Sequence, residues 1–139
     1  MNKYTFDEIN IGDAASFAFP VTEEVVDNFA AFSGDENPLH TNSEYARATE
    51  FKGRVAHGMI GGCLFSKLVG VYLPGEYCLY LSQTLQFKKP IFLGTMVEVS
   101  GKVTQKVEAF KTIEIETSIK NIETGERMIE GKALVKLLK

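Results

Sequence analysis

The chain has few cysteines and no long apolar run, and both absences narrow its class. Its 139 residues include only two cysteines, Cys63 and Cys78, and these are not at metal-ligand spacing. We therefore expect buried thiols in a reducing compartment rather than a disulfide framework. Residues 1–8 lack the apolar run of a signal peptide, and residues 59–73, the most apolar window, contain a lysine and three glycines. These features predict a soluble, cytoplasmic protein with no membrane partner.

The sequence also lacks an excess of positive charge. It has 15 Lys and Arg against 18 Asp and Glu, which gives a net charge of −3, and the basic residues are dispersed. Because nucleic acids attract clustered positive charge, nucleic acid is not an expected partner. A glycine-rich phosphate loop is missing, since Gly61-Gly62 lies within a predicted helix rather than after a strand. A nucleophile elbow is missing too, since Ser66 is flanked by Phe65 and Lys67.

The composition is 45% hydrophobic and 24% charged, which is ordinary for a globular chain, and we expect residues 1–139 to form one domain. Alternating apolar residues over 14–21 predict a short edge strand. Thr22, followed by two acidic residues, predicts the start of a helix, and Gly34 predicts its end. The expected buried stripe of this helix comprises Val25, Val26, Phe29, Ala30 and Phe32.

A second helical stretch is apolar on nearly every face. It covers residues 57–73 (HGMIGGCLFSKLVGVYL) and is followed by Pro74-Gly75, which should end it. Because it has no polar side, we expect other elements to enclose it. A shorter helical segment is expected between the two, with Ser43 as its N-cap.

From residue 77 onward, apolar residues recur at every second position. Strands with one polar face are therefore expected over 79–87, 97–103, 112–119 and 128–135. In the first of these, the expected apolar face comprises Leu79, Leu81, Leu85 and Phe87. One early strand, a buried helix and four antiparallel strands predict an α+β hot-dog fold, in which a curved antiparallel sheet wraps the central helix.

Residues 32–40 (FSGDENPLH) form a polar loop that carries two proton-transfer groups, Asp35 and His40. Asn37-Pro38 forces an extended or turning backbone between them, so a turn can bring the two side chains together. Each has an ordinary structural explanation, because an aspartate can cap its own turn and a core histidine can bond to a carbonyl. Together, next to a buried helix, they are candidates for acid/base chemistry.

The start of the central helix offers a second candidate feature. Gly58 leaves room for a ligand oxygen to approach the unpaired N–H groups and the positive dipole end of the helix. Small residues recur one turn apart at Gly58, Gly62, Ser66 and Gly70. This row either forms a groove for a slender ligand or lets the helix pack closely on the sheet.

Histidine and carboxylate spacing raises the possibility of a metal site. His40 and Glu44 are four residues apart, and His57 could supply a third ligand. No recognisable ligand motif accompanies them, so we expect no metal and no cofactor.

Residues 32–40, followed by 55–59 (VAHGM), closely resemble the hydratase signature of MaoC-like, (R)-specific enoyl-CoA hydratases. The string Asp-x-Asn-Pro-x-His is the more specific of the two motifs. Residues 83–94 and 131–136 also look like strands of this family, so the resemblance covers almost the whole chain. It implies a hydro-lyase of fatty acid metabolism that interconverts trans-2-enoyl-CoA and (R)-3-hydroxyacyl-CoA. It also implies a homodimer, or a higher homo-oligomer, with one continuous sheet and acyl-thioester sites near the interface.

The resemblance assigns roles to residues that match the family motifs. Asp35 and His40 correspond to the catalytic pair, and Asn37 corresponds to a supporting amide. Gly58 corresponds to the backbone donor to the thioester carbonyl, and Ser66 to a small residue that lines the acyl tunnel.

One position departs from the family pattern. The family often has an acidic residue two positions after the histidine, whereas this chain has Asn42, and we expect the change to affect helix capping more than chemistry. Three alternatives stay open: a 3-hydroxyacyl-[acyl-carrier-protein] dehydratase, a hot-dog thioesterase, and a noncatalytic acyl-CoA-binding hot-dog protein.

Overall fold

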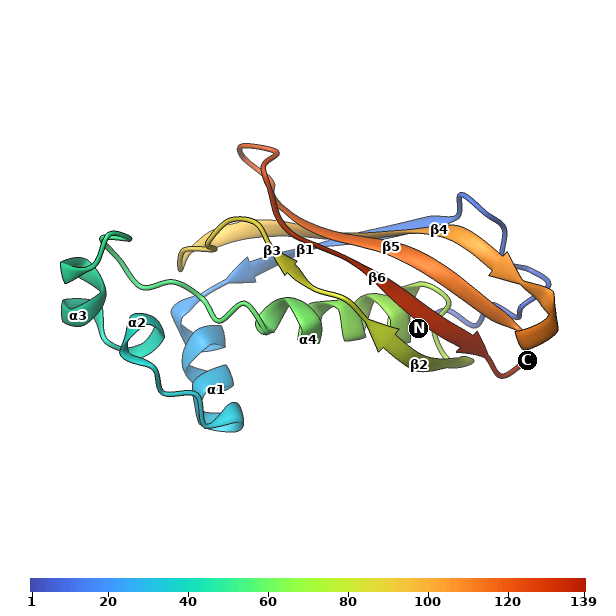
Figure 1. Cartoon of the computed structure of the whole chain (residues 1–139), viewed down its shortest axis with the longest axis horizontal. Helices are drawn as coiled ribbons and strands as arrows, with labels where there is room; N and C mark the ends of the chain where they lie inside the picture. Colours follow the sequence, from blue (N-terminus) through green and yellow to red (C-terminus); the bar gives the residue numbers. More distant parts are fainter.

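The computed structural model describes all residues from 1 to 139 and shows a curved antiparallel sheet around one helix (Figure 1). The strands are β1 (Ala14–Val21), β2 (Cys78–Gln83), β3 (Gln86–Phe87), β4 (Thr95–Val107), β5 (Thr112–Asn121) and β6 (Arg127–Leu137). They are ordered β1-β4-β5-β6-β2, and β3 also pairs with β6. The prediction of an α+β hot-dog fold is confirmed.

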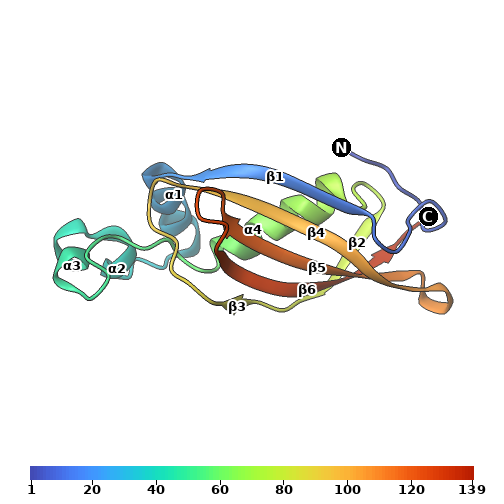
Figure 2. The same ribbon diagram turned by 90° about the horizontal axis from the view of Figure 1, so that it is seen from above.

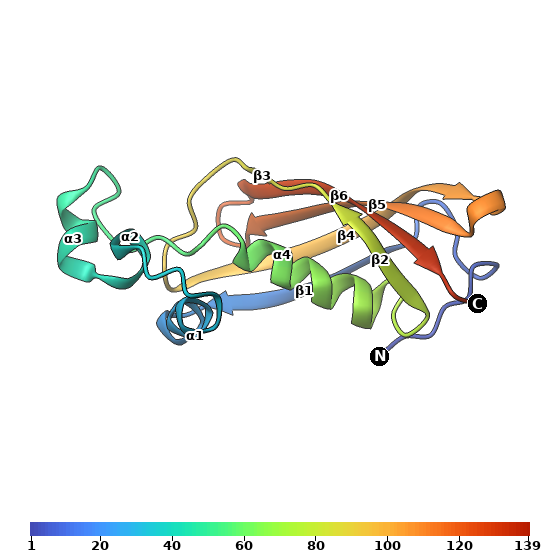
Figure 3. The same cartoon turned by 60° about the horizontal axis from the view of Figure 1, so that its bottom comes forward.

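The helices occupy two different places relative to the sheet. They are α1 (Glu23–Ser33), α2 (Pro38–Thr41), α3 (Ser43–Ala48) and α4 (Ile60–Lys67), and a π-helical turn (Leu68–Tyr72) continues α4. Figures 2 and 3 show that α4 runs along the concave face of the sheet, whereas α1, α2 and α3 gather beyond one end of it. Both termini lie at the opposite end, where the Phe6 N–H donates to the Lys139 carbonyl at 2.8 Å. No helix combines the length and apolarity needed to cross a bilayer.

The core is divided into two apolar clusters that the central helix connects. Cluster 1 packs α4 against the sheet half nearer α1, and comprises Val21, Val26, Ala56, Ile60, Leu64, Phe65, Leu68, Ile91, Val97, Val99, Ile119, Met128 and Ile129. Cluster 2 packs the π-helical turn against the other half, and comprises Phe6, Ile9, Val69, Leu73, Val103, Ile113, Ile115, Ala133, Val135 and Leu137. Close contact between α4 and the sheet depends on Gly61, because a Cβ there would lie 2.5 Å from Ile129 Cδ1.

The central helix differs from its prediction at both ends and on one side. It starts at Ile60 rather than His57, and its last turn is π-helical, so that the regular helix is only eight residues long. One side of it is not enclosed: Met59 is 56% exposed, and Cys63 and Ser66 are exposed. The expectation of a buried thiol is therefore wrong for Cys63, while Cys78 is half-buried.

The strand expected over 79–87 is divided into β2 and β3, and β2 turns the opposite face inward at its start. Leu79 and Leu81 are exposed, whereas Cys78 and Tyr80 pack on cluster 2. A register shift between Tyr80 and Ser82 then reverses the alternation, which is the physical reason why Leu85 packs on cluster 1. Further along, Phe87 is again largely exposed, as is Phe32 at the end of α1, so both were wrongly expected to be buried.

The edge strand β1 matches its prediction and has a proline, Pro20, as its second-last residue. The Val21 carbonyl accepts a hydrogen bond from Gly94 N–H on the β4 side at 2.7 Å. Because successive residues of a strand face opposite edges, the backbone of Pro20 is turned away from β4. Proline has no N–H, so it cannot donate to a further strand at this edge.

Candidate active site

The loop after α1 has the geometry that its local sequence predicts. Thr22 caps the start of α1, and Gly34 ends it in a left-handed conformation (φ 77°). The Asp35 carboxylate then accepts the Asn37 N–H at 3.2 Å, and the side-chain oxygen of Asn37 caps α2 by accepting the Leu39 N–H at 3.0 Å. These two turns reverse the chain and place His40 on the same side as Asp35.

Asp35 and His40 come together with a second histidine, His57. One ligand-type atom from each of the three side chains lies within 4.8 Å of the other two. Two hydrogen bonds of about 2.8 Å that meet at a tetrahedral oxygen span roughly 4.6 Å. Asp35 and His40 are therefore close enough for one water molecule to bond to both side chains.

The ring of His40 is held in a defined orientation. Its Nδ1 lies 2.6 Å from the Val55 carbonyl oxygen. A carbonyl oxygen can only accept a hydrogen bond, so Nδ1 carries the proton. In the neutral ring, Nε2 is then unprotonated and can accept a proton from a bound water. Nδ1 of His40 therefore bonds to a backbone carbonyl, as expected of a core histidine, while Nε2 remains free for acid/base chemistry.

Arg54 also contacts the loop that carries Asp35 and His40, through the His40 carbonyl. This residue was not identified from the sequence. It is 9% exposed, and its Nε donates to the His40 carbonyl at 2.5 Å. Its other two nitrogens form ion pairs with α1, at 2.7 Å to Glu23 and 2.5 Å to Asp27. The guanidinium therefore connects α2 to α1, with one hydrogen bond to α2 and two ion pairs to α1. No sequence signal identifies this role, because the partners lie 14 to 31 residues away.

Gly58 presents a free backbone donor beside the cluster. Its N–H and that of Met59 have no hydrogen-bond partner, whereas Gly61 N–H already donates to the Gly58 carbonyl at 2.9 Å. A side chain at position 58 would displace the Phe87 ring, because its Cβ would lie 2.7 Å from that ring. A cavity of about 260 Å³ opens at this point, with mainly apolar walls formed by Ala56, Gly58, Met59, Phe87, Lys89, Pro90, Ile91 and Ile129.

The predicted row of small residues does not form a groove within one chain. Gly58 is closely covered by Phe87, but a Cβ at Gly62 would make only an ordinary contact and one at Gly70 would meet nothing. Ser66 is exposed and lies outside the cavity beside Gly58. The close packing expected for this row occurs instead at Gly61, on the sheet side of the helix.

The histidine and carboxylate cluster differs from the metal site considered from the sequence. Asp35 joins His40 and His57, and Glu44 does not belong to the cluster. The two imidazole rings face each other, with centroids 4.0 Å apart and planes inclined by 31°. Each ring uses one nitrogen for a backbone carbonyl, which fixes the ring's orientation and leaves its other nitrogen free.

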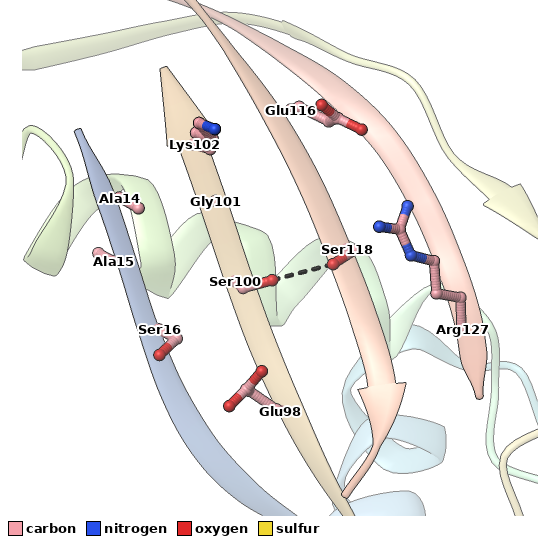
Figure 4. Close-up of a pocket in the computed structure, with 10 residues that line it drawn as sticks. All are labelled: Ala14, Ala15, Ser16, Glu98, Ser100, Gly101, Lys102, Glu116, Ser118 and Arg127. Atoms are coloured by element: carbon pink, nitrogen blue, oxygen red, sulfur yellow. Dashed lines mark hydrogen bonds between the residues drawn. The ribbon is translucent and has the colours of Figure 1, made fainter. Parts of the chain in front are cut away.

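A larger depression of about 540 Å³ lies on the other face of the sheet (Figure 4). Its side chains are mostly polar, and Ser100 and Ser118 form a hydrogen bond across it at 2.9 Å. Figure 4 shows these side chains on the face opposite α4, and none belongs to the cluster around Asp35. The candidate site is therefore the smaller cavity beside Gly58 and the adjoining acid/base pair.

Taken together, these features define a hot-dog domain with an acid/base pair next to the start of its central helix. A family model described as MaoC like domain matches residues 9–125, and the chain belongs to this family. It is 38% identical to the (R)-specific enoyl-CoA hydratase of Rhodospirillum rubrum, over 94% of this chain and 89% of that protein.

Two solved structures have the same fold throughout. The unliganded R-hydratase PhaJ1 of Pseudomonas aeruginosa is 34% identical with a TM-score of 0.91, over 96% of this chain and 84% of that one. The (R)-hydratase of A. caviae involved in PHA biosynthesis is 36% identical with a TM-score of 0.89, over 93% of this chain and 97% of that one. The predicted family is confirmed.

Proposed function

We propose that this chain is an (R)-specific enoyl-CoA hydratase, a hydro-lyase that adds water to trans-2-enoyl-CoA and catalyses the reverse dehydration. The observation that carries the proposal is the Asp35 and His40 pair, held within 4.8 Å beside free N–H groups at the start of α4. Its close relatives are (R)-specific enoyl-CoA hydratases, and acyl-CoA is accordingly the proposed substrate.

In the proposed mechanism, Asp35 and His40 hold one water between them. Both present acceptors, the carboxylate of Asp35 and the unprotonated Nε2 of His40. As the water oxygen forms a bond to C3 of the enoyl thioester, one of its protons is removed. The proton that the pair has taken from the water is delivered to C2 from the same side, so that one molecule of water is added in total. The reverse sequence removes water from an (R)-3-hydroxyacyl thioester.

Negative charge accumulates on the thioester oxygen during the attack. The free Gly58 N–H, together with the positive end of the helix, is the proposed donor to this oxygen. One such donor contributes about 3 kcal/mol to transition-state stabilisation. The mainly apolar walls of the cavity beside Gly58 lower the local dielectric constant, which strengthens this interaction.

The proposed assembly is a homodimer, and two exposed apolar surfaces support it. One side of α4 is exposed at Met59, Cys63 and Ser66. The edge strand β2 exposes Leu79 and Leu81. A second copy would cover such surfaces, and it would convert the open row at Gly62 and Ser66 into a closed acyl channel.

The test is the hydration of crotonyl-CoA, with the configuration of the product determined by chiral chromatography. Replacing Asp35→Asn or His40→Ala should each lower kcat by about 100-fold or more, the scale of a lost acid/base group. Glu36→Gln is the matched control, because it removes an exposed carboxylate from the same loop. Near-normal turnover in both folded variants, or an (S)-product, would refute the proposal.

Two further assay arms separate the alternatives. Faster turnover of crotonyl-acyl carrier protein than of crotonyl-CoA would indicate the dehydratase of fatty-acid synthesis. Free thiol released from saturated butyryl-CoA would indicate a thioesterase, and binding of acyl-CoA without turnover would indicate a noncatalytic module.

A further inference from the structure

His57 is the most deeply buried polar group of the candidate site, although the proposed chemistry does not use it. Its side chain contacts three separate parts of the chain, and the residue is only 3% exposed. Its Nε2 lies 2.9 Å from the main-chain oxygen of Asp35, its ring faces that of His40 at 4.0 Å, and it packs on Phe29 of α1 at 4.7 Å. It is thus in contact with both members of the acid/base pair.

The hydrogen bond to Asp35 fixes the tautomer of His57. The Asp35 carbonyl can only accept, so Nε2 must carry the proton. In the neutral ring, Nδ1 is then a bare lone pair, and it is buried with no hydrogen-bond partner. His40 has the opposite tautomer, with its proton on Nδ1. A buried imidazole with one unsatisfied nitrogen is costly, and an apolar residue would fill the same space without that cost.

His57 also belongs to a short segment that fixes every part of the site. Arg54 donates to the His40 carbonyl, the Val55 carbonyl accepts from the His40 ring, and His57 donates to the Asp35 carbonyl. The next residue is Gly58, whose N–H is free. One stretch of five residues therefore sets the positions of the acid, the base and the backbone donor relative to one another.

We propose that His57 is a positioning residue, which holds the backbone of Asp35 and the ring of His40 at the separation that one water requires. This inference rests on the proposed hydratase function. The other hydrogen bonds of Asp35 stay within its own loop: its N–H donates to the Ser33 hydroxyl, and its carboxylate accepts from the Asn37 N–H. The bond from His57 connects this loop to the segment that leads into α4. Loss of that bond displaces the carboxylate relative to His40 without removing either group.

The first test is spectroscopic and independent of activity. The chain has only two histidines, so a protein labelled with ¹⁵N-histidine gives two ring systems, which a His57→Phe variant assigns. Ring nitrogen shifts near neutral pH should show His57 protonated on Nε2 and His40 protonated on Nδ1. A proton on Nδ1 of His57 instead would overturn the proposal.

The second test is kinetic, with crotonyl-CoA. His57→Phe keeps a flat ring against His40 but removes the donor, and should lower kcat by about 10-fold to 100-fold with KM nearly unchanged. His57→Gln keeps an amide donor that can reach the Asp35 carbonyl, and should recover much of the lost kcat. Phe29→Leu, which alters the other neighbour of the His57 ring, is the control and should leave kcat within about twofold.

The outcomes separate a positioning role from a purely structural one. If both His57 variants lower the folded fraction while kcat per folded molecule stays normal, His57 is structural and the proposal is wrong. The same conclusion follows if His57→Phe retains the wild-type kcat. If the wild-type protein does not hydrate crotonyl-CoA at all, the proposed function fails, while the tautomer measurement still decides the geometry on which this inference is built.

Discussion

The two ends of the molecule are held together by different forces. The sheet and central helix enclose two clusters of fully buried apolar side chains, whereas α2 buries no residue and α3 buries only Ala46. The site end is held mainly by directional contacts from residues 54–57 to the loop that carries Asp35 and His40. Apolar burial depends on area and tolerates small shifts, but a hydrogen bond requires a defined distance and angle. The two ends should therefore respond separately to mutation, in stability and in activity.

The largest expected effect is on stability, from a change in the sheet body. Ile115 is completely buried in cluster 2, far from the site end. Ile115→Ala should lower the free energy of unfolding by about 2–5 kcal/mol, through lost burial and the cavity left behind. Urea denaturation measures this change, and kcat per folded molecule should be normal. Ile11→Ala, which removes the same atoms from an exposed position, should have almost no effect. A fall in kcat as large as that of a site variant would contradict the separation of the two ends.

The converse change removes the clamp at the site end. Arg54→Met keeps much of the side-chain volume but removes the bonds to the His40 carbonyl and to α1. The two carboxylates that lose their partner, Glu23 and Asp27, are more than half exposed and stay hydrated. The free energy of unfolding should therefore fall by only about 1 kcal/mol. Turnover of crotonyl-CoA should fall by about tenfold or more because α2 loses its position. Arg47→Met, at an exposed site on α3, is the control. A large loss of stability with normal kcat would show that Arg54 stabilises the fold rather than positions the site.

A smaller effect is expected at Ser66, on the bare side of α4. If a second copy closes this side into an acyl channel, Ser66→Phe should lower turnover of octenoyl-CoA relative to crotonyl-CoA by about fivefold, since overpacking costs at least about 1 kcal/mol. Ser66→Ala should keep the ratio of the two rates. Steady-state kinetics on enoyl-CoAs of increasing length measure this ratio, and an equal loss at every length would exclude Ser66 from the channel.

The smallest effect is a titration in the sheet body. Burial, reinforced by the neighbouring Cys78, raises the pKa of Tyr80 to about 12. The folded state thus binds this proton more tightly than the unfolded state, whose tyrosines titrate near pH 10. The resulting stabilisation is complete below about pH 10 and is lost as the pH rises toward 12. Ultraviolet titration of the phenols should show one late step that Tyr80→Phe removes. A Tyr80 that ionises near pH 10 would show that this strand is not packed as described.

The predictable parts of the fold depend on local signals. Thr22 and Gly34 mark the ends of α1 because capping needs only neighbouring residues, and the turn at Asn37-Pro38 follows in the same way. Asn42 also fulfils its expected role in capping, although it replaces Ser43 as the N-cap of α3. The Asp35 and His40 pair could be anticipated because this single local turn creates it.

The parts that were missed depend on distant contacts. Strand β2 has apolar residues on both faces, so the period of two defined the strand but not which face is inside, and the register shift after Tyr80 depends on its pairing with β6. The role of Arg54 and the bond from His57 to the Asp35 carbonyl are likewise identified only when the chain folds back on the loop. Their partners are separated from them by 14 to 31 residues, and no sequence pattern specifies such pairs.

The proline at the outer edge of β1 has a consequence for how copies of this chain can associate. With no N–H at Pro20, that margin cannot form an unbroken ladder with a further strand, whereas β2 at the opposite margin exposes two leucines. If two copies pair through β2, the β2 edge of each copy is covered by the other. Growth then stops at a closed pair, and the protein avoids the open-ended polymer that two equally receptive margins would permit.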